Sequence, residues 1–136
     1  MRMKVVTADV SDAVFDVTAK MIESNVGCVV ITQNDDIAGI VTKGDVIKNT
    51  ILKRPQQYQG KERISSIMIT PVVTISPDDS LEDAAKLMSD RHVSKLPVVD
   101  QESGLLVGII TSTDIIGIEP AYVAFLKDLI SSSLGK

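Results

Sequence analysis

A glycine, two aliphatic residues and a threonine, with an aspartate three residues after the threonine, occur twice in this sequence. The two copies are Thr42 to Asp45 in GIVTKGD and Thr111 to Asp114 in GIITSTD. This spacing is typical of a capping box, in which the threonine hydroxyl accepts a hydrogen bond from the backbone amide of the aspartate. The aspartate side chain in turn accepts one from the backbone amide of the threonine. Amides at a helix N-terminus also attract anions. The motif therefore predicts a helix start and leaves an anion-binding role open.

Both motifs belong to a longer internal duplication. VVT at 5–7 returns at 72–74, an offset of 67, whereas the threonine–aspartate motif returns at an offset of 69. The second copy therefore carries two extra residues, which fall in the polar stretch 101–104. A unit that cannot bury its apolar face alone is usually duplicated so that the copies bury each other. A pseudo-twofold pair also creates two related clefts, which favours a ligand-binding module.

Each copy is predicted to fold in the order β-α-β-β-α. A short extended piece (4–8 and 71–76) leads into a helix, and Asp79 or Ser80 is expected to cap the second of these helices. Two apolar runs around a polar turn then indicate a hairpin, with 29–31 and 98–99 as buried strands. A last helix begins at the shared threonine. The first helices show apolar residues at helical spacing, namely Val14, Val17, Thr18 and Met21 in one copy and Leu81, Ala84, Ala85 and Met88 in the other.

These patterns predict an α/β (α+β) fold in which the two repeats pack sheet to sheet about a pseudo-twofold axis. The expected organisation is a first repeat over 1–53, a polar linker over 54–63, a second repeat over 64–118 and a C-terminal helix over 119–136. Pro120 suits the start of that last helix. Its apolar face must pack on the module or on another subunit, and consists of Tyr122, Leu126, Leu129 and Ile130.

Charge and composition exclude several function classes. The 136-residue chain has a net charge of −4, which disfavours non-specific nucleic-acid binding. The locally basic stretch 43–63 is more typical of a solvated connector than of a phosphate-facing or partner-facing surface. No apolar run is long enough for a signal peptide or a membrane span, so we expect a soluble, cytoplasmic protein. Cys28, the single cysteine, lies in an apolar run and is expected to act as a small hydrophobe.

Catalytic and metal-binding motifs are missing from the sequence. His92 is the single histidine, and its position predicts a solvated or C-capping residue at a helix end. Without a second histidine or a cysteine pair, no zinc-type site is expected. No phosphate-loop, dinucleotide-binding or nucleophile-elbow string occurs, and no nucleophile–base pair is evident. We therefore predict that the protein is not an enzyme and requires no cofactor.

The strings SSIMITPVVTISPDDSLEDAAKLM and HVSKLPVVD, followed by GIITSTD, resemble the cystathionine-β-synthase (CBS) domain. The resemblance covers about residues 1–50 and 64–117, so the chain resembles a stand-alone tandem pair, or Bateman module. It implies a regulatory module that binds AMP, ADP, ATP or S-adenosylmethionine and acts on a separate, unknown partner protein. It also implies a homodimer, head-to-head or head-to-tail. The alternatives are a structural or dimerising pair with degenerate sites and, least favoured, an enzyme.

The resemblance also implies which residues bind the ligand. The motif aspartate would accept hydrogen bonds from both ribose hydroxyls, and the motif threonine would lie beside the phosphates. Each cleft would combine the two repeats, and Lys95 in one cleft would contact phosphate where Cys28 stands in the other. We therefore expect cleft A to bind a charged nucleotide more tightly. Cleft A would contain Thr42, Asp45, Thr74, Ile75, Val93, Ser94 and Lys95; cleft B would contain Thr111, Asp114, Thr7, Ala8, Val26, Gly27 and Cys28.

Overall fold

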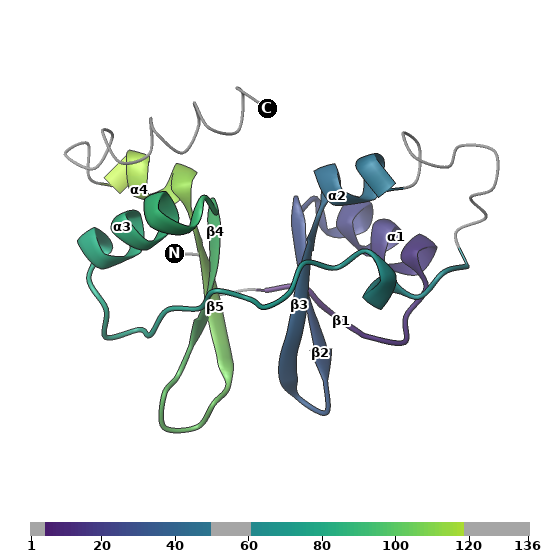
Figure 1. The fold of residues 1–136 in the computed structure, drawn as a ribbon, viewed down its shortest axis with the longest axis horizontal. Coiled ribbons are helices and arrows are strands. Elements are labelled where there is room, and N and C mark those ends of the chain that lie inside the picture. The colour runs from purple at the N-terminus through teal and green to yellow at the C-terminus, as the bar shows by residue number, and fades with distance from the viewer. Residues whose placement is uncertain (1–4, 50–60, 119–136) are drawn as a thin grey trace. The chain divides into compact units, whose positions relative to one another are not determined.

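The computed structural model describes residues 5–49 and 61–118, which form two compact units (Figure 1). The first unit runs from Val5 to Val72, and the second begins at Val73. The first unit follows the predicted β-α-β-β-α order, and the second follows it with its first strand reduced to an isolated β-bridge. In the described part of the chain, no helix has the length and apolar character needed to cross a membrane.

The first unit is built on a three-stranded sheet. β1 (Thr7–Asp9) runs parallel to β2 (Cys28–Gln33), and β2 pairs antiparallel with β3 (Asp36–Thr42). Asn34 and Asp35 have positive φ angles of 52° and 69°, which suit the two-residue hairpin turn between β2 and β3. The unit also contains helix α1 (Val14–Ser24), helix α2 (Lys43–Ile47) and the short 3-10 helix η2 (Ile64–Ser66).

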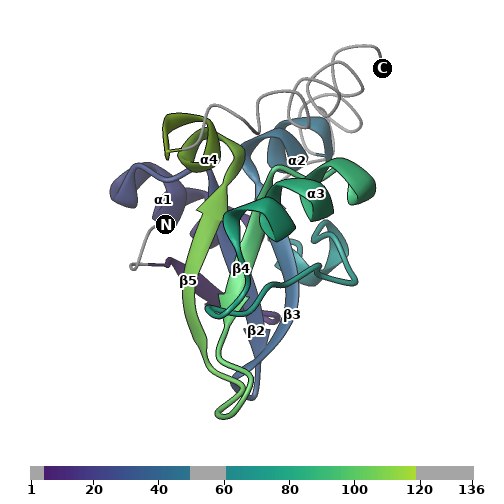
Figure 2. The same cartoon turned by 90° about the vertical axis from the view of Figure 1, so that its left-hand side faces the viewer.

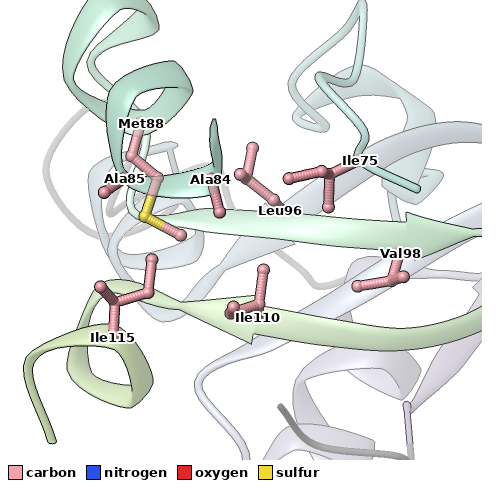
Figure 3. Packing of buried hydrophobic residues seen from close by; sticks show 8 residues of the cluster. All are labelled: Ile75, Ala84, Ala85, Met88, Leu96, Val98, Ile110 and Ile115. Atoms are coloured by element: carbon pink, nitrogen blue, oxygen red, sulfur yellow. The ribbon is translucent and has the colours of Figure 1, made fainter. Parts of the chain in front are cut away.

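The second unit has α3 (Leu81–Arg91), β4 (Lys95–Val99), β5 (Leu106–Thr111) and α4 (Ser112–Ile118). Figure 2 shows β4 and β5 side by side, joined by a loop at one end. The predicted helical faces are confirmed in both units. Val14, Val17 and Met21 are buried on α1, and Ala84, Ala85 and Met88 are buried on α3 (Figure 3).

The expected first strand of the second unit, over 71–76, is reduced to a single parallel bridge between Ile75 and Val98. The equivalent strand β1 is held in part by bonds from Val30 N to Val6 O and from Val10 N to Thr32 O, each 3.1 Å long. When the two repeats are aligned, Pro97 stands in place of Val30 and Pro77 in place of Val10. Proline has no amide hydrogen, so neither can form the equivalent bond. Apart from Ile75, the prediction of a strand over 71–76 was therefore wrong.

The predicted buried strands are otherwise confirmed. Residues 29–31 are fully buried in β2, and Val98 is buried in β4. Val99, at the end of β4, is only half-buried. His92 ends α3 in a left-handed conformation with φ 55°, as Asn25 ends α1 with φ 52°, which confirms its prediction as an exposed C-cap residue.

Residues 64–72, which begin the second sequence repeat, pack on the first unit. Ile64 is fully buried there, and its amide donates to Asp12 O at 2.7 Å. Ile69 and Ile40 exchange backbone hydrogen bonds of 2.9 and 3.1 Å. The compact unit therefore extends to Val72, beyond the sequence repeat that it contains.

The first helices of the two units differ at their N-caps. Ser80 accepts from Asp83 N at 3.0 Å and forms a capping box on α3, which confirms it as the cap. Ala13 precedes α1 with a similar extended backbone but no side-chain hydrogen bond, although Asp16 stands at the matching third position. The two helix starts thus differ by one missing hydroxyl.

Installing that hydroxyl is expected to stabilise the protein. Ala13→Ser should raise the free energy of unfolding by about 0.5–1 kcal/mol, because the new hydroxyl and the Asp16 carboxylate can then form a capping box. Ser80→Ala should lower it by about 1 kcal/mol. Chemical denaturation of both variants measures these changes. A neutral or destabilising Ala13→Ser would contradict the equivalence of the two caps.

Candidate functional site

The first threonine–aspartate motif lies at the junction of β3 and α2. Asp45 N donates to Thr42 Oγ1 at 3.2 Å, and Asp45 Oδ2 accepts from both Thr42 N and Thr42 Oγ1 at 2.9 Å. The predicted capping box is therefore confirmed. Both residues are half-buried. Asp45 Oδ1 accepts no hydrogen bond from any residue that the structure describes.

The second motif repeats this arrangement where β5 meets α4. Asp114 N donates to Thr111 Oγ1 at 3.2 Å, and Thr111 N donates to Asp114 Oδ2 at 3.0 Å. Asp114 Oδ1 likewise has no donor among the described residues. Each motif thus uses one carboxylate oxygen to start its helix, while the other has no hydrogen-bond donor among the described residues.

Each motif lies beside the start of the second strand of its own repeat. In the first unit, Cys28 pairs with Thr42, and Lys43 N donates to Gly27 O at 3.0 Å. In the second unit, Lys95 pairs with Thr111, and Ser112 N donates to Ser94 O at 2.8 Å. Each unit therefore contains one group of predicted site residues, which we call a half-site. The Thr42 half-site consists of Gly27, Cys28, Thr42 and Asp45. The Thr111 half-site consists of Ser94, Lys95, Thr111 and Asp114.

The remaining predicted site residues lie on the first strand or just after the first helix. Thr7 and Thr74 are exposed, whereas Ala8 and Ile75, the residues after them, are buried. Val26 and Val93 are half-buried, and their amides donate to Met21 O and Met88 O, both at 3.0 Å, which closes the ends of α1 and α3. Both valines thus have a structural role in ending a helix.

Comparison of the sequence with known protein families agrees with this duplicated arrangement, in which a threonine–aspartate motif follows each hairpin. The CBS domain family matches residues 1–51 and 64–120. The chain belongs to the CBS-domain family. An uncharacterized protein of Methanopyrus kandleri is 33% identical to this CBS pair over 130 residues, and the match spans 93% of this chain and 64% of that protein.

Two solved structures show which ligands similar CBS proteins bind. The CBS domain pair of protein MJ0100, in complex with 5′-methylthioadenosine and S-adenosyl-L-methionine, is 28% identical with a TM-score of 0.73. The match covers 85% of this chain and 92% of that one. The cytosolic domain of the Mg²⁺ channel MgtE, in complex with ATP, is 25% identical with a TM-score of 0.69, and 84% of this chain matches 44% of it.

The CBS pair has a cation near the site that the sequence analysis missed. Lys20 Nζ on α1 donates to Thr7 O at 2.9 Å. Lys20 therefore lies beside Thr7, a predicted site residue, although the sequence analysis did not name this lysine. The available signal was a difference between the repeats, because Lys20 aligns with Leu87. Lys95, in contrast, is half-buried, and its side chain makes no hydrogen bond or ion pair with the described residues.

Other polar groups of the two units serve local structure. The Ser11 hydroxyl and amide donate to Asp9 Oδ2 in the turn before α1, and these bonds lower the pKa of the Asp9 carboxyl. Within residues 5–49 and 61–118, no three histidine, cysteine or acidic side chains form a group that could hold a metal ion.

Proposed function

We propose that this CBS pair is a regulatory module that binds an adenosine-containing ligand and acts on a separate partner protein. The observation that carries the proposal is the available Oδ1 of Asp45 and of Asp114, each held on a half-buried carboxylate beside a strand start. The MJ0100 and MgtE complexes support an adenosyl or adenine-nucleotide ligand.

The chemistry of ribose suits such a carboxylate. Each carboxylate oxygen has two acceptor sites, so Oδ1 alone can accept hydrogen bonds from both neighbouring hydroxyls of a ribose. In each motif Oδ2 is held by the capping box, which fixes the orientation of the carboxylate before any ligand arrives. Little conformational freedom is then lost on binding, which favours affinity.

The proposed clefts are unequal in their cations. Following the family arrangement, cleft A combines Thr42 and Asp45 with Thr74, Ile75 and the strand start at 93–95, so Lys95 can bind phosphate. Cleft B combines Thr111 and Asp114 with Thr7, Ala8 and residues 26–28. Its nearby cation, Lys20, already donates to Thr7 O. We therefore propose that AMP, ADP or ATP binds cleft A more tightly, and that cleft B is empty or takes a less charged adenosine ligand.

Calorimetric titration with AMP, ADP, ATP and S-adenosylmethionine tests this function. At least one of the four is expected to bind saturably, and at 100 times its Kd it should stabilise the fold by about 2.7 kcal/mol in a thermal unfolding assay. Absence of both heat and stabilisation for all four would instead support the alternative, a structural or dimerising CBS pair with degenerate sites.

We also propose that the protein forms a homodimer. Phe15 and Ile22 on α1 and Ile47 on α2 are exposed in the first unit, with 68%, 75% and 50% of their surface accessible. Such apolar groups on helices favour a self-complementary twofold contact. Light scattering at tens of micromolar should report about twice the chain mass of 14.6 kDa. A monomer under these conditions would contradict the proposal.

A further inference from the structure

An apolar pocket of about 200 Å³ lies between the start of α3 and the strands of the second unit. Its lining includes Ile75, Leu81, Ala84, Val98 and Ile110. Figure 3 shows four of these, with Ala84 on α3 and Ile110 and Val98 on the strands. The pocket lies in a single unit, and the threonine–aspartate motifs do not line it.

The first unit shows what fits at this place. The residues that align with the pocket lining are Ala8, Val14, Val17, Ile31 and Val41, and all five belong to one buried cluster. The fully buried side chain of Ile64 joins that cluster. The first-unit residues that correspond to the pocket lining thus share their cluster with an isoleucine from a separate segment of the chain.

Backbone hydrogen bonds hold that segment in place. Val14 N donates to Glu62 O at 2.8 Å, and Ile64 N donates to Asp12 O at 2.7 Å. Arg63, between them, forms an antiparallel bridge with Ala13. The segment is therefore added to the start of α1 as a short extended strand, with its isoleucine as an anchor.

The equivalent backbone groups of the second unit are Leu81 N and Asp79 O. Neither has a hydrogen-bond partner among the residues that the structure describes. Among the described residues, no segment covers the pocket and these two backbone groups as residues 62–64 cover the start of α1 in the first unit.

The charges around the pocket indicate which residue should precede the anchor. Four acidic residues follow one another closely at the start of α3, namely Asp78, Asp79, Glu82 and Asp83, and all are exposed. Asp79 and Asp83 accept hydrogen bonds from Ser76 N and Ser80 N. The carboxylates of Asp78 and Glu82 accept none from the described residues. A basic residue at the place of Arg63 would therefore meet opposite charge.

We propose that this pocket of the second unit binds an extended segment of a partner protein in which a basic residue directly precedes an isoleucine or valine. The anchor side chain fills the pocket, and the flanking backbone bonds to Leu81 N and Asp79 O. This inference goes beyond the proposed ligand binding and does not depend on it.

A peptide with the sequence GKERISS, copied from residues 60–66, is a suitable probe for the full chain. A single aliphatic anchor is expected to give a Kd on the order of 1 mM, so NMR titration is the appropriate measurement. We expect saturable shifts of the Asp79 and Leu81 amides. A peptide with aspartate in place of isoleucine should bind at least tenfold more weakly.

Variants of the protein separate the pocket from its charged rim. Ala84→Leu should fill the pocket and weaken peptide binding at least tenfold, while thermal unfolding verifies that the variant is folded. The surface variant Asp78→Asn/Glu82→Gln should weaken binding several-fold and reduce its salt dependence. Asp90→Asn, an exposed change further along α3, is the matched control and should bind as the natural chain does.

Two results would overturn the proposal. One is a failure of GKERISS to shift the Asp79 and Leu81 amides of the full chain. The other is equal binding of the isoleucine and aspartate peptides, or of the natural chain and a folded Ala84→Leu variant. Neither result bears on nucleotide binding, which the calorimetric titration measures separately.

Discussion

Asp45→Ala is expected to weaken the binding of AMP, ADP or ATP by about 1.5–3 kcal/mol, which is the scale of hydrogen bonds to a charged group. The variant removes the carboxylate whose Oδ1 is available in the Thr42 half-site. Asp114→Ala should cost less for the same nucleotide, because we assign that aspartate to the less favourable cleft. Isothermal titration calorimetry of the two variants gives both values.

Asp45 also caps α2, so the loss of the cap must be separated from the loss of the site. Asp83→Ala is the matched control. The Asp83 carboxylate accepts a hydrogen bond from Ser80 N in the same kind of capping box but lies outside both half-sites. It should reduce stability without changing nucleotide affinity. If Asp45→Ala left affinity unchanged while Asp114→Ala abolished it, the cleft assignment would be wrong.

Gly39→Ala is expected to lower the free energy of unfolding by about 1–3 kcal/mol, the range found for overpacked cores. A Cβ atom at Gly39 would lie 2.5 Å from Met68 Sδ, 2.7 Å from Met68 Cγ and 3.0 Å from Met68 Cβ. The far end of the methionine can move, but its Cβ is fixed by the backbone. The segment that carries Met68 must therefore shift away from β3.

Two further variants identify the cause. Gly27→Ala is the control, because nothing lies within 4 Å of a Cβ at that position, and its effect should be small. In Gly39→Ala/Met68→Ala the two shortest contacts, with Met68 Sδ and Cγ, are removed and only the contact with Cβ remains. The double variant should therefore be more stable than the sum of the single changes implies. Urea denaturation of the natural chain, Gly39→Ala, Met68→Ala and the double variant measures the four free energies that this cycle needs. Additive effects would show that Met68 is not the cause.

The helix starts and helical faces could be predicted from the sequence because they depend on neighbours a few residues apart. The capping boxes at Thr42 and Thr111 join residues three positions apart, and the buried face of α1 repeats within two turns. The missing strand at 71–76 was predictable in principle. Once the repeats are aligned, Pro77 and Pro97 replace two amide donors of β1.

Contacts between segments distant in the chain required the tertiary structure. Lys20 reaches Thr7 O only because α1 packs beside β1, and the sequence pattern of α1 does not specify that distance. The two half-sites depend in the same way on strand register, which pairs Cys28 with Thr42 and Lys95 with Thr111. A shift of one residue would have moved each partner to the other face of its sheet.

The sequence by itself determined the duplication, the order of elements and the CBS family, because these follow from repeated strings and local periodicity. The tertiary structure alone decided where the segment at 61–69 packs. Ile64 is one of several isoleucines in a polar context, and its burial comes from bonds to Asp12 and Val14, far away in the chain. The open pocket of the second unit follows from the same non-local packing, since it is visible only beside its occupied counterpart.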